Sequence, residues 1–315
     1  MFDTPVLFLV FNRPDTTRRV LAAIREAQPK QLFIAADGPR SAVPGEAALC
    51  ATMRQQLLDG IDWDCRVETL FRDENLGCEA AVASGISWFF SQVEEGIILE
   101  DDCLPAADFF GFCQEMLARY KNEPAVAMVS GTSFLGTEPR SEKYFFSKYY
   151  AIWGWATWRE RWEVLYESGM PQWAERNKSG WLRTVFRQSN IVYFYTAIFD
   201  KMARGLVDTW DTNWNYSLLR RDKLTVTPVI NLVSNIGLEG THSALAEGNI
   251  FNLPVGSYVS DGAAPAVVAW KEELDALQFV NAGVDILRWR IMARYFLDRW
   301  GLLALVLRLQ RFFRL

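Results

Sequence analysis

The sequence has few of the residues that build disulfide frameworks and zinc centres. It contains five cysteines and one histidine in 315 residues, and no two cysteines show C-x-x-C spacing. An odd number of cysteines without that spacing argues against a disulfide scaffold and against a structural zinc site. We therefore expect reduced cysteines, as in proteins of the cytosol.

Positive charge and long apolar runs are also scarce. The 33 Lys and Arg residues are outnumbered by 38 Asp and Glu residues, which gives a net charge of −5. This balance argues against nucleic acid as the main partner, because duplex binding depends on clustered Lys and Arg. No run reaches the roughly eighteen apolar residues of a membrane-spanning helix, and no signal segment is recognisable before the first apolar strand. We expect a cytoplasmic protein.

Apolar runs do alternate with helical patterns through the first part of the chain. Strands are predicted at 6–11, 32–36, 66–71, 96–99 and 125–129, and helices from about 14, at 79–92 and at 108–119. Continuous apolar strands separated by helices are typical of a mostly parallel sheet with helices on both faces. The fold class predicted is therefore α/β.

After about residue 137 the alternation stops and aromatic residues become dense, notably at 144–162 and 208–216. A helix is predicted at 190–204, a strand at 225–230 and a linker at 257–266. The chain has 13 tryptophans, which can be core residues or flat apolar walls for a sugar or a base. We expect this half to form the wall of a pocket.

Polar side chains follow each of the first four predicted strands. In order along the chain they are Asn12 and Arg13, Asp37, Asn75, and the trio Glu100, Asp101 and Asp102. Ligands bind beyond the carboxyl ends of strands in such sheets, so these residues are expected at one rim. Each alone is explained as well by a cap or a solvated turn; four strand ends together favour a site.

The stretch GIILEDDCLP, residues 96–105, ends a buried strand on three carboxylates. Buried carboxylates are costly unless a cation meets them, and hard oxygen ligands suit Mg²⁺ or Mn²⁺. Strand alternation would place Glu100 and Asp102 on one side and Asp101 on the other. A divalent ion there could bridge to a diphosphate and neutralise its charge as it leaves. The alternative is an acidic loop in solvent.

Segment 100–110, EDDCLPAADFF, resembles the metal-binding segment of the N-acetylglucosaminyltransferase I family, whose members are inverting, nucleotide-sugar-dependent glycosyltransferases of the GT-A fold. Further segments are similar to family elements and occur in the same order over about residues 5–245. They are 12–21, 37–38, 125–133, 154–155, 210–214 and 235–242. The resemblance implies a GT-A-type α/β fold, and the chain beyond the resemblance is expected to form a helical C-terminal extension.

The resemblance also implies residue roles. Arg13 and Asp37 would contact the nucleobase, which fits uracil because its N3–H needs an acceptor and its carbonyls need donors. Asp102 would bind Mn²⁺ or Mg²⁺ directly, and Asp211 would be the catalytic base. Glu100 and Asp101 would hold sugar, ribose or metal-bound water. The loop with Gly237, Gly240 and His242 would close over the donor, and the remaining donor-site candidates are Asn12, Asn75, Trp155 and Trp210.

The sequence departs from the family pattern at three points. Asn12 replaces an Asp of the family, and the loop before His242 is one residue shorter. Three residues instead of two separate Trp210 from Trp214, which leaves Asp208 and Asp211 both open as the base. The expected function is metal-dependent, inverting transfer of a hexosyl or N-acetylhexosaminyl group from a UDP-linked donor, such as UDP-N-acetylglucosamine, to a glycan or lipid-linked acceptor.

Under this interpretation, residues 1–137 form a nucleotide-sugar-binding half, 138–255 an acceptor-binding and catalytic half of the same domain, and 256–315 a linker and a C-terminal helix. Residues 286–315 contain seven arginines and one acid among aromatic residues, as in helices that lie in lipid headgroups. We expect peripheral contact with the inner face of the membrane. The alternative is a helix packed on the catalytic domain or on another subunit.

Two other function classes compete with the glycosyltransferase hypothesis. A sugar nucleotidyltransferase or related nucleotide enzyme normally has a glycine-rich, basic loop after the first strand, whereas residues 11–17 are FNRPDTT. A non-catalytic sugar-binding module would use the aromatic residues but would leave the acidic trio without an evident purpose.

Overall fold

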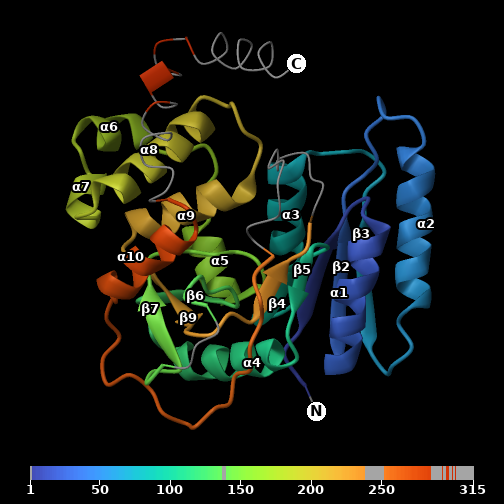
Figure 1. Cartoon of the computed structure of the whole chain (residues 1–315). Coiled ribbons are helices and arrows are strands. Elements are labelled where there is room, and N and C mark those ends of the chain that lie inside the picture. The colour runs from blue at the N-terminus through green and yellow to red at the C-terminus, as the bar shows by residue number, and fades with distance from the viewer. Residues whose placement is uncertain are drawn as a thin grey trace, which may run out of the picture.

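The computed structural model describes residues 2–136, 140–237 and 252–284, together with residues 293, 296, 297, 300 and 302 (Figure 1). Its main sheet has eight strands in the order β3-β2-β1-β4-β8-β6-β9-β7. Their bounds are β1 Val6–Val10, β2 Gln31–Ala36, β3 Arg66–Phe71, β4 Glu95–Glu100, β6 Val126–Ser130, β7 Tyr144–Ser147, β8 Trp155–Trp158 and β9 Leu224–Pro228. A second sheet pairs β5, Cys103–Pro105, with β10, Val233–Asn235.

The main sheet is mostly parallel. Strands β3, β2, β1 and β4 are parallel neighbours, and β6 and β9 are parallel to each other. Strand β8 is antiparallel to both β4 and β6, and β7 is antiparallel to β9. The first four strands therefore end at the same edge of the sheet.

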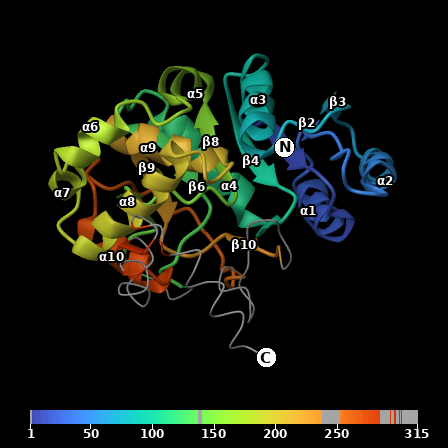
Figure 2. The same cartoon turned by 90° about the horizontal axis from the view of Figure 1, so that it is seen from above.

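Helices cover both faces of this sheet, as the view from above shows (Figure 2). One face packs against α1 (Pro14–Ala27), α2 (Glu46–Asp59) and α4 (Asp108–Tyr120). The other face packs against α3, α5, α8, α9 and α10, whose bounds are Cys78–Phe90, Arg159–Leu165, Ser189–Ala203, Trp210–Arg220 and Glu272–Asn281. Two short helices, α6 (Trp173–Lys178) and α7 (Leu182–Val185), complete the second layer.

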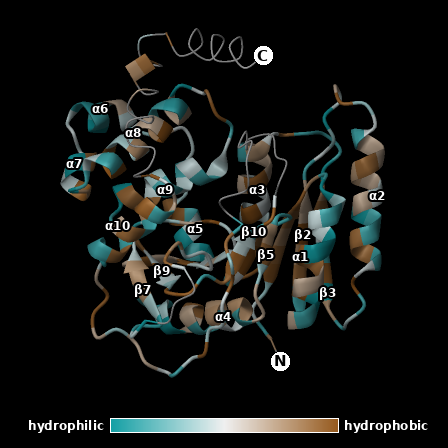
Figure 3. Cartoon of the chain, viewed as in Figure 1, coloured by the Kyte–Doolittle hydropathy of each residue, from teal (hydrophilic) through white to brown (hydrophobic). Residues whose placement is uncertain are grey.

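The alternation of side chains along β1 explains the two layers. Val6, Phe8 and Val10 belong to the core on the α1 side, whereas Leu7 and Leu9 belong to the core on the α3 side. Because both faces are buried, the strand is continuously apolar, and hydrophobic residues follow the central strands and α3 (Figure 3). The fold-class prediction is confirmed.

The aromatic half is packed as core. Trp155, Trp162, Trp210 and Trp214 are each at most 2% exposed. The rings of Trp155 and Trp210 stack with centroids 5.4 Å apart, and those of Trp162 and Trp214 lie 5.2 Å apart. Such pairs add roughly 0.5–1.5 kcal/mol beyond their buried area. Of the two interpretations of these tryptophans, the structure supports the core.

The C-terminal part begins as an ordered strap. The segment predicted as a linker, 257–266, lies against α4: Asp108 accepts hydrogen bonds from the Ser257 hydroxyl and the Tyr258 amide, at 2.8 and 3.0 Å. Helix α10 follows, and most of residues 285–315 lie outside the described residues. Within the described part of the chain, no helix has the length and apolar character needed to cross a membrane.

Candidate active site

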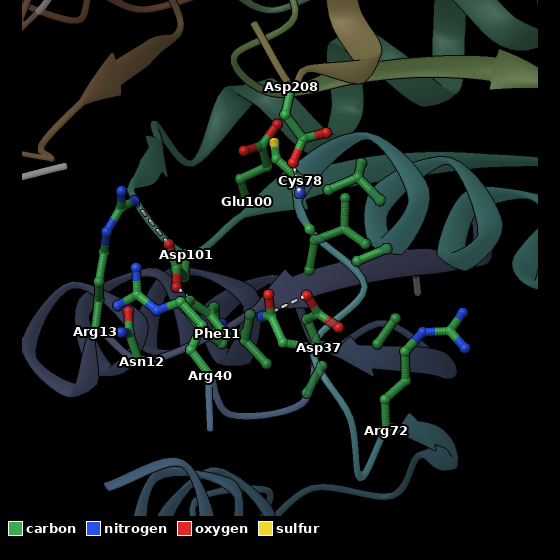
Figure 4. Close-up of a pocket in the computed structure, with 18 residues that line it drawn as sticks. Phe11, Asn12, Arg13, Asp37, Arg40, Arg72, Cys78, Glu100, Asp101 and Asp208 are labelled. Atoms are coloured by element: carbon green, nitrogen blue, oxygen red, sulfur yellow. Dashed lines mark hydrogen bonds and ion pairs between the residues drawn. The ribbon is translucent and has the colours of Figure 1, made fainter. Parts of the chain in front are cut away.

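A cavity of about 650 Å³ opens at the carboxyl ends of β1, β2, β3 and β4 (Figure 4). Six of the predicted site residues line it: Asn12, Arg13, Asp37, Asn75, Glu100 and Asp101. The beginning of α3 forms its apolar side with Cys78, Ala81 and Val82. The parallel arrangement of the four strands thus brings together residues that are up to about ninety positions apart in the sequence.

Arg13 is the cation that meets the acidic trio. Its Nη1 atom lies 3.1 Å from Asp101 Oδ1 and 2.6 Å from Asp102 Oδ2, and Asp101 Oδ2 also accepts the Phe11 amide at 3.1 Å. The expectation that Asp101 points away from Asp102 is wrong. Strand β4 ends at Glu100 and a turn follows, so strand alternation does not extend to the two aspartates.

One guanidinium cannot neutralise three neighbouring carboxylates. Burial, followed by the charges of Asp102 and Asp101, raises the pKa of Glu100 to about 8. Burial also raises the pKa of Asp101 to about 6, against the opposing effect of Arg13. The Oε1 atom of Glu100 is buried without a hydrogen-bond partner among the described residues. The cluster therefore favours a further positive group, since burial penalises unpaired charge.

The donor set fits a hard divalent cation in chemistry and in charge. Mg²⁺ and Mn²⁺ accept one or two carboxylates and take their other ligands from phosphate and water. No group of three or more His, Cys, Asp or Glu side chains in the described part of the chain is arranged to enclose a metal. The aspartates could therefore supply only part of a coordination shell, with the remainder from outside the protein.

The first residues of the predicted closing loop lie against Asp102. The amide of Ile236 donates to the Asp102 carbonyl at 2.8 Å. Gly237 packs so closely that a Cβ atom at this position would lie 2.5 Å from Asp102 Oδ2. His242 and Gly240, the later residues of that loop, lie outside the described residues.

Asp37 has partners for both carboxylate oxygens. Oδ1 accepts the amides of Gly38 and Leu76 at 2.9 and 3.0 Å, and Oδ2 accepts Asn75 Nδ2 at 2.8 Å. Arg54 adds a second link between these strand ends, because its Nη2 donates to the carbonyls of Asp37 and Arg72, each at 2.8 Å. Asp37 and Asn75 together hold the ends of β2 and β3 in place.

The two candidate bases differ in their surroundings. Asp208 accepts the amides of Cys78 and Glu79, both at 2.9 Å, and so caps the first turn of α3. Gly77 makes this contact possible, because it has a φ of 84° and a Cβ there would lie 2.6 Å from Asp208 Oδ2. Asp208 is thus committed to a structural role at a helix N-terminus.

Asp211 lies in the first turn of α9 and is half-buried. The Thr209 hydroxyl donates to its Oδ1 atom. The negative charge of Asp211 contributes to the raised pKa of Glu100. Burial is the main cause that raises the pKa of Cys78 to about 12, and the charge of Asp211 adds to it. These couplings place Asp211 near Glu100. Of the two carboxylates, Asp208 borders the cavity and Asp211 does not.

Trp155 and Trp210 were expected to line the donor site. Both belong to the buried aromatic cluster, at 0% and 2% exposure, and neither borders the cavity. Trp210 instead fixes the start of α9, the turn that carries Asp211.

The structure adds residues that the sequence analysis did not identify. Arg40 lines the cavity, and its guanidinium lies 5.5 Å from the Phe11 ring centroid. Glu46, at 3% exposure, accepts Asn12 Nδ2 at 2.8 Å, the Arg40 amide at 2.6 Å and Arg40 Nε at 3.0 Å. Arg40 follows the end of β2 and could have been found by the strand-end rule. Glu46 gives no such signal, because it begins a helix.

Comparisons with known proteins give only distant likenesses. No family model and no curated protein matches the chain. Mouse xyloside xylosyltransferase 1 is 10% identical with a TM-score of 0.37, covering 70% of this chain and 82% of that chain. A UDP-glucose pyrophosphorylase complexed with UDP-glucose is 12% identical with a TM-score of 0.31, covering 53% of this chain and 80% of that chain. The 4-diphosphocytidyl-2C-methyl-D-erythritol synthase from Anaerococcus prevotii is 8% identical with a TM-score of 0.35, covering 71% of this chain and 88% of that chain. At such values the likenesses assign no activity to this chain.

Proposed function

We propose that this protein is a metal-dependent, inverting glycosyltransferase that uses a nucleotide-diphosphate sugar, with UDP as the nucleotide. The observation that carries the proposal is the acidic trio at the end of β4, which holds more negative charge than Arg13 neutralises. Two of its members, Glu100 and Asp101, border a cavity of about 650 Å³, and Asp102 lies behind them against Arg13. The resemblance of segment 100–110 to the N-acetylglucosaminyltransferase I family supports the same assignment.

Asp102 would hold Mn²⁺ or Mg²⁺, with Asp101 beside it. The ion would supply charge neutralisation for the diphosphate as it leaves. Arg13, already in contact with both aspartates, would offer its remaining N–H groups to the donor. The loop that begins at Gly237, directly against Asp102, would then exclude water from the donor.

Asp211 would act as the general base. Its carboxylate would take the proton of the acceptor hydroxyl while the hydroxyl oxygen forms a bond to the anomeric carbon and the bond from that carbon to the diphosphate oxygen breaks. A single displacement of this kind inverts the anomeric configuration and releases the nucleoside diphosphate. Trp210 stacks on Trp155 at the start of α9, and this packing would position the base in the next residue.

The competing enzyme hypothesis is a sugar nucleotidyltransferase. Against it, the turn after β1 contains no glycine, and α1 begins at Pro14 directly after Arg13. Two screens with Mn²⁺ test the two hypotheses, one of nucleotide sugars and one of nucleoside triphosphates paired with sugar phosphates. Release of free sugar and nucleoside diphosphate from one donor supports the glycosyltransferase. Release of pyrophosphate from a nucleoside triphosphate and a sugar phosphate would replace it with the alternative.

A further inference from the structure

Arg13 and Asp37, the two residues expected to contact the nucleobase, have other partners in this structure. Asp37 uses both oxygens on Gly38, Asn75 and Leu76, and Arg13 lies against Asp101 and Asp102. Asn12 and Arg40 also border the cavity, on the opposite side of Phe11 from Asp37 (Figure 4). Each of these two retains a hydrogen-bonding group that has no partner among the described residues.

Glu46 determines which groups these two residues present. A carboxylate only accepts hydrogen bonds, so Asn12 must turn its amide nitrogen toward Glu46, 2.8 Å away, and keep its carbonyl oxygen for another partner. Arg40 gives Nε, Nη2 and its backbone amide to Glu46, which leaves Nη1 as a donor. Both residues contact the same oxygen, Glu46 Oε1, so Asn12 and Arg40 lie side by side, and each has one group left for a ligand.

The chemistry of this pair fits a base better than a phosphate. Glu46 compensates the charge of Arg40, and the Asn12 carbonyl would repel a phosphate oxygen. The Phe11 ring beneath the Arg40 guanidinium offers a flat apolar surface beside the pair. A free acceptor on Asn12 and a free donor on Arg40 are complementary in kind to the imino N–H and a carbonyl of uracil. Cytosine presents the reverse, an unprotonated ring nitrogen next to an amino group.

We propose that Asn12 and Arg40, oriented by the buried Glu46, read the base of the nucleotide and select uracil over cytosine. The proposal rests on the proposed function, since it assumes that a nucleotide occupies the cavity. Asn12 and Arg40 are specificity-determining residues, and Glu46 is a positioning residue that does not touch the ligand. A wrong nucleobase would cover these two polar groups without satisfying their hydrogen bonds, which lowers its affinity.

The test is calorimetric titration of the full chain with UDP and with CDP in the presence of Mn²⁺. We expect the wild type to bind UDP at least about tenfold more tightly than CDP, the fold-change that corresponds to 1.4 kcal/mol. Asn12→Ala should bring the ratio close to one. Glu46→Gln should do the same while changing the UDP affinity only a few-fold, because the glutamine amide can donate to Asn12 and let its amide turn over.

Two further variants make the result decisive. Asp59→Asn removes the same charge from the exposed end of α2 and should leave the ratio unchanged. Asp37→Asn tests the alternative that Asp37 binds the nucleobase. A ratio that survives Asn12→Ala but falls in Asp37→Asn overturns the proposal, as does equal binding of UDP and CDP to the wild type. If a thermal unfolding measurement shows that Glu46→Gln is not folded, the UDP-to-CDP affinity ratio of Asn12→Ala decides the test by itself. If neither UDP nor CDP binds to the wild type, the proposed function itself is rejected.

Discussion

Two regions of this protein have an unusual composition, and the fold treats them in opposite ways. At the carboxyl ends of β1 to β4, charged side chains converge on a cavity, and Glu100 keeps a buried oxygen without a partner among the described residues. In the aromatic cluster, Trp155, Trp162, Trp210 and Trp214 pack on one another and border no described cavity. An unusual set of residues indicates a ligand site where the tertiary structure leaves charge uncompensated. It indicates hydrophobic core where the tertiary structure buries apolar side chains against one another.

The largest effect should come from the acidic trio. Asp102→Asn removes one formal charge where the cation is proposed to bind, and we expect Mn²⁺-dependent transfer to fall to background, because the ion would lose its direct ligand. Turnover measured across Mn²⁺ concentrations checks this. Asp15→Asn, an exposed acid at the start of α1, is the matched control. Wild-type turnover in Asp102→Asn at the same Mn²⁺ concentration would remove the metal assignment.

A large effect is also expected at the proposed base. Asp211→Asn should lower turnover by about 10²–10⁴, the usual contribution of general-base catalysis, and leave donor affinity nearly unchanged. Asp208→Asn is the comparison, because asparagine caps a helix about as well as aspartate, so its turnover should remain within a few-fold of wild type. If Asp208→Asn is the inactive variant, the roles of the two aspartates are reversed.

The aromatic cluster should respond in stability instead of in ligand binding. Trp155→Ala creates a cavity in the core, and we expect a loss of about 3–5 kcal/mol in the free energy of unfolding, measured by chemical denaturation. Trp155→Phe should lose less, and its affinity for the donor should equal that of wild type. A Trp155→Phe protein that unfolds like wild type but binds the donor weakly would make this cluster a ligand wall.

A smaller effect concerns acid stability. Hydrogen bonds from Arg40 are the main cause that lowers the pKa of Glu46 from its ordinary 4.5 to about 2. A lowered pKa means that ionised Glu46 stabilises the fold fully above about pH 4.5, and that this contribution disappears as the pH falls toward 2. The free energy of unfolding should therefore fall more steeply over this range in wild type than in Glu46→Gln. The same dependence of the unfolding free energy on pH in both proteins would contradict the prediction.

The smallest effect on activity is expected from the basic C-terminal segment. We propose that it contacts anionic lipid, so replacing three of its arginines by glutamine should reduce sedimentation with anionic liposomes at low salt and spare donor hydrolysis. The three are Arg308, Arg311 and Arg314. A control replaces three exposed arginines elsewhere, Arg18, Arg66 and Arg187. Equal loss in both proteins, or no binding by wild type, would assign the segment to protein contacts.

Local sequence patterns were enough to predict β1 to β4, β6 and β9, and the edge of the sheet at which the candidate site lies, but not β5, β7, β8 and β10. The apolar runs that form β1 to β4 and the polar residues after them follow from periodicity, which depends on neighbouring residues alone. That is why Asn12, Arg13, Asp37, Asn75 and the trio at 100–102 are placed at one rim by the sequence alone. Periodicity does not fix the residue at which a strand ends, and the orientation of Asp101 was predicted incorrectly for that reason.

The partner of each side chain, in contrast, depends on how distant segments pack. Arg13 meets Asp101 and Asp102, which are 88 and 89 positions away, and Asp208 caps α3 from 130 positions away. Glu46 is a positioning residue only because α2 packs beside the turn after β1. Burial, hydrogen bonding and charge compensation arise between segments far apart in the chain, so local sequence patterns contain no record of them.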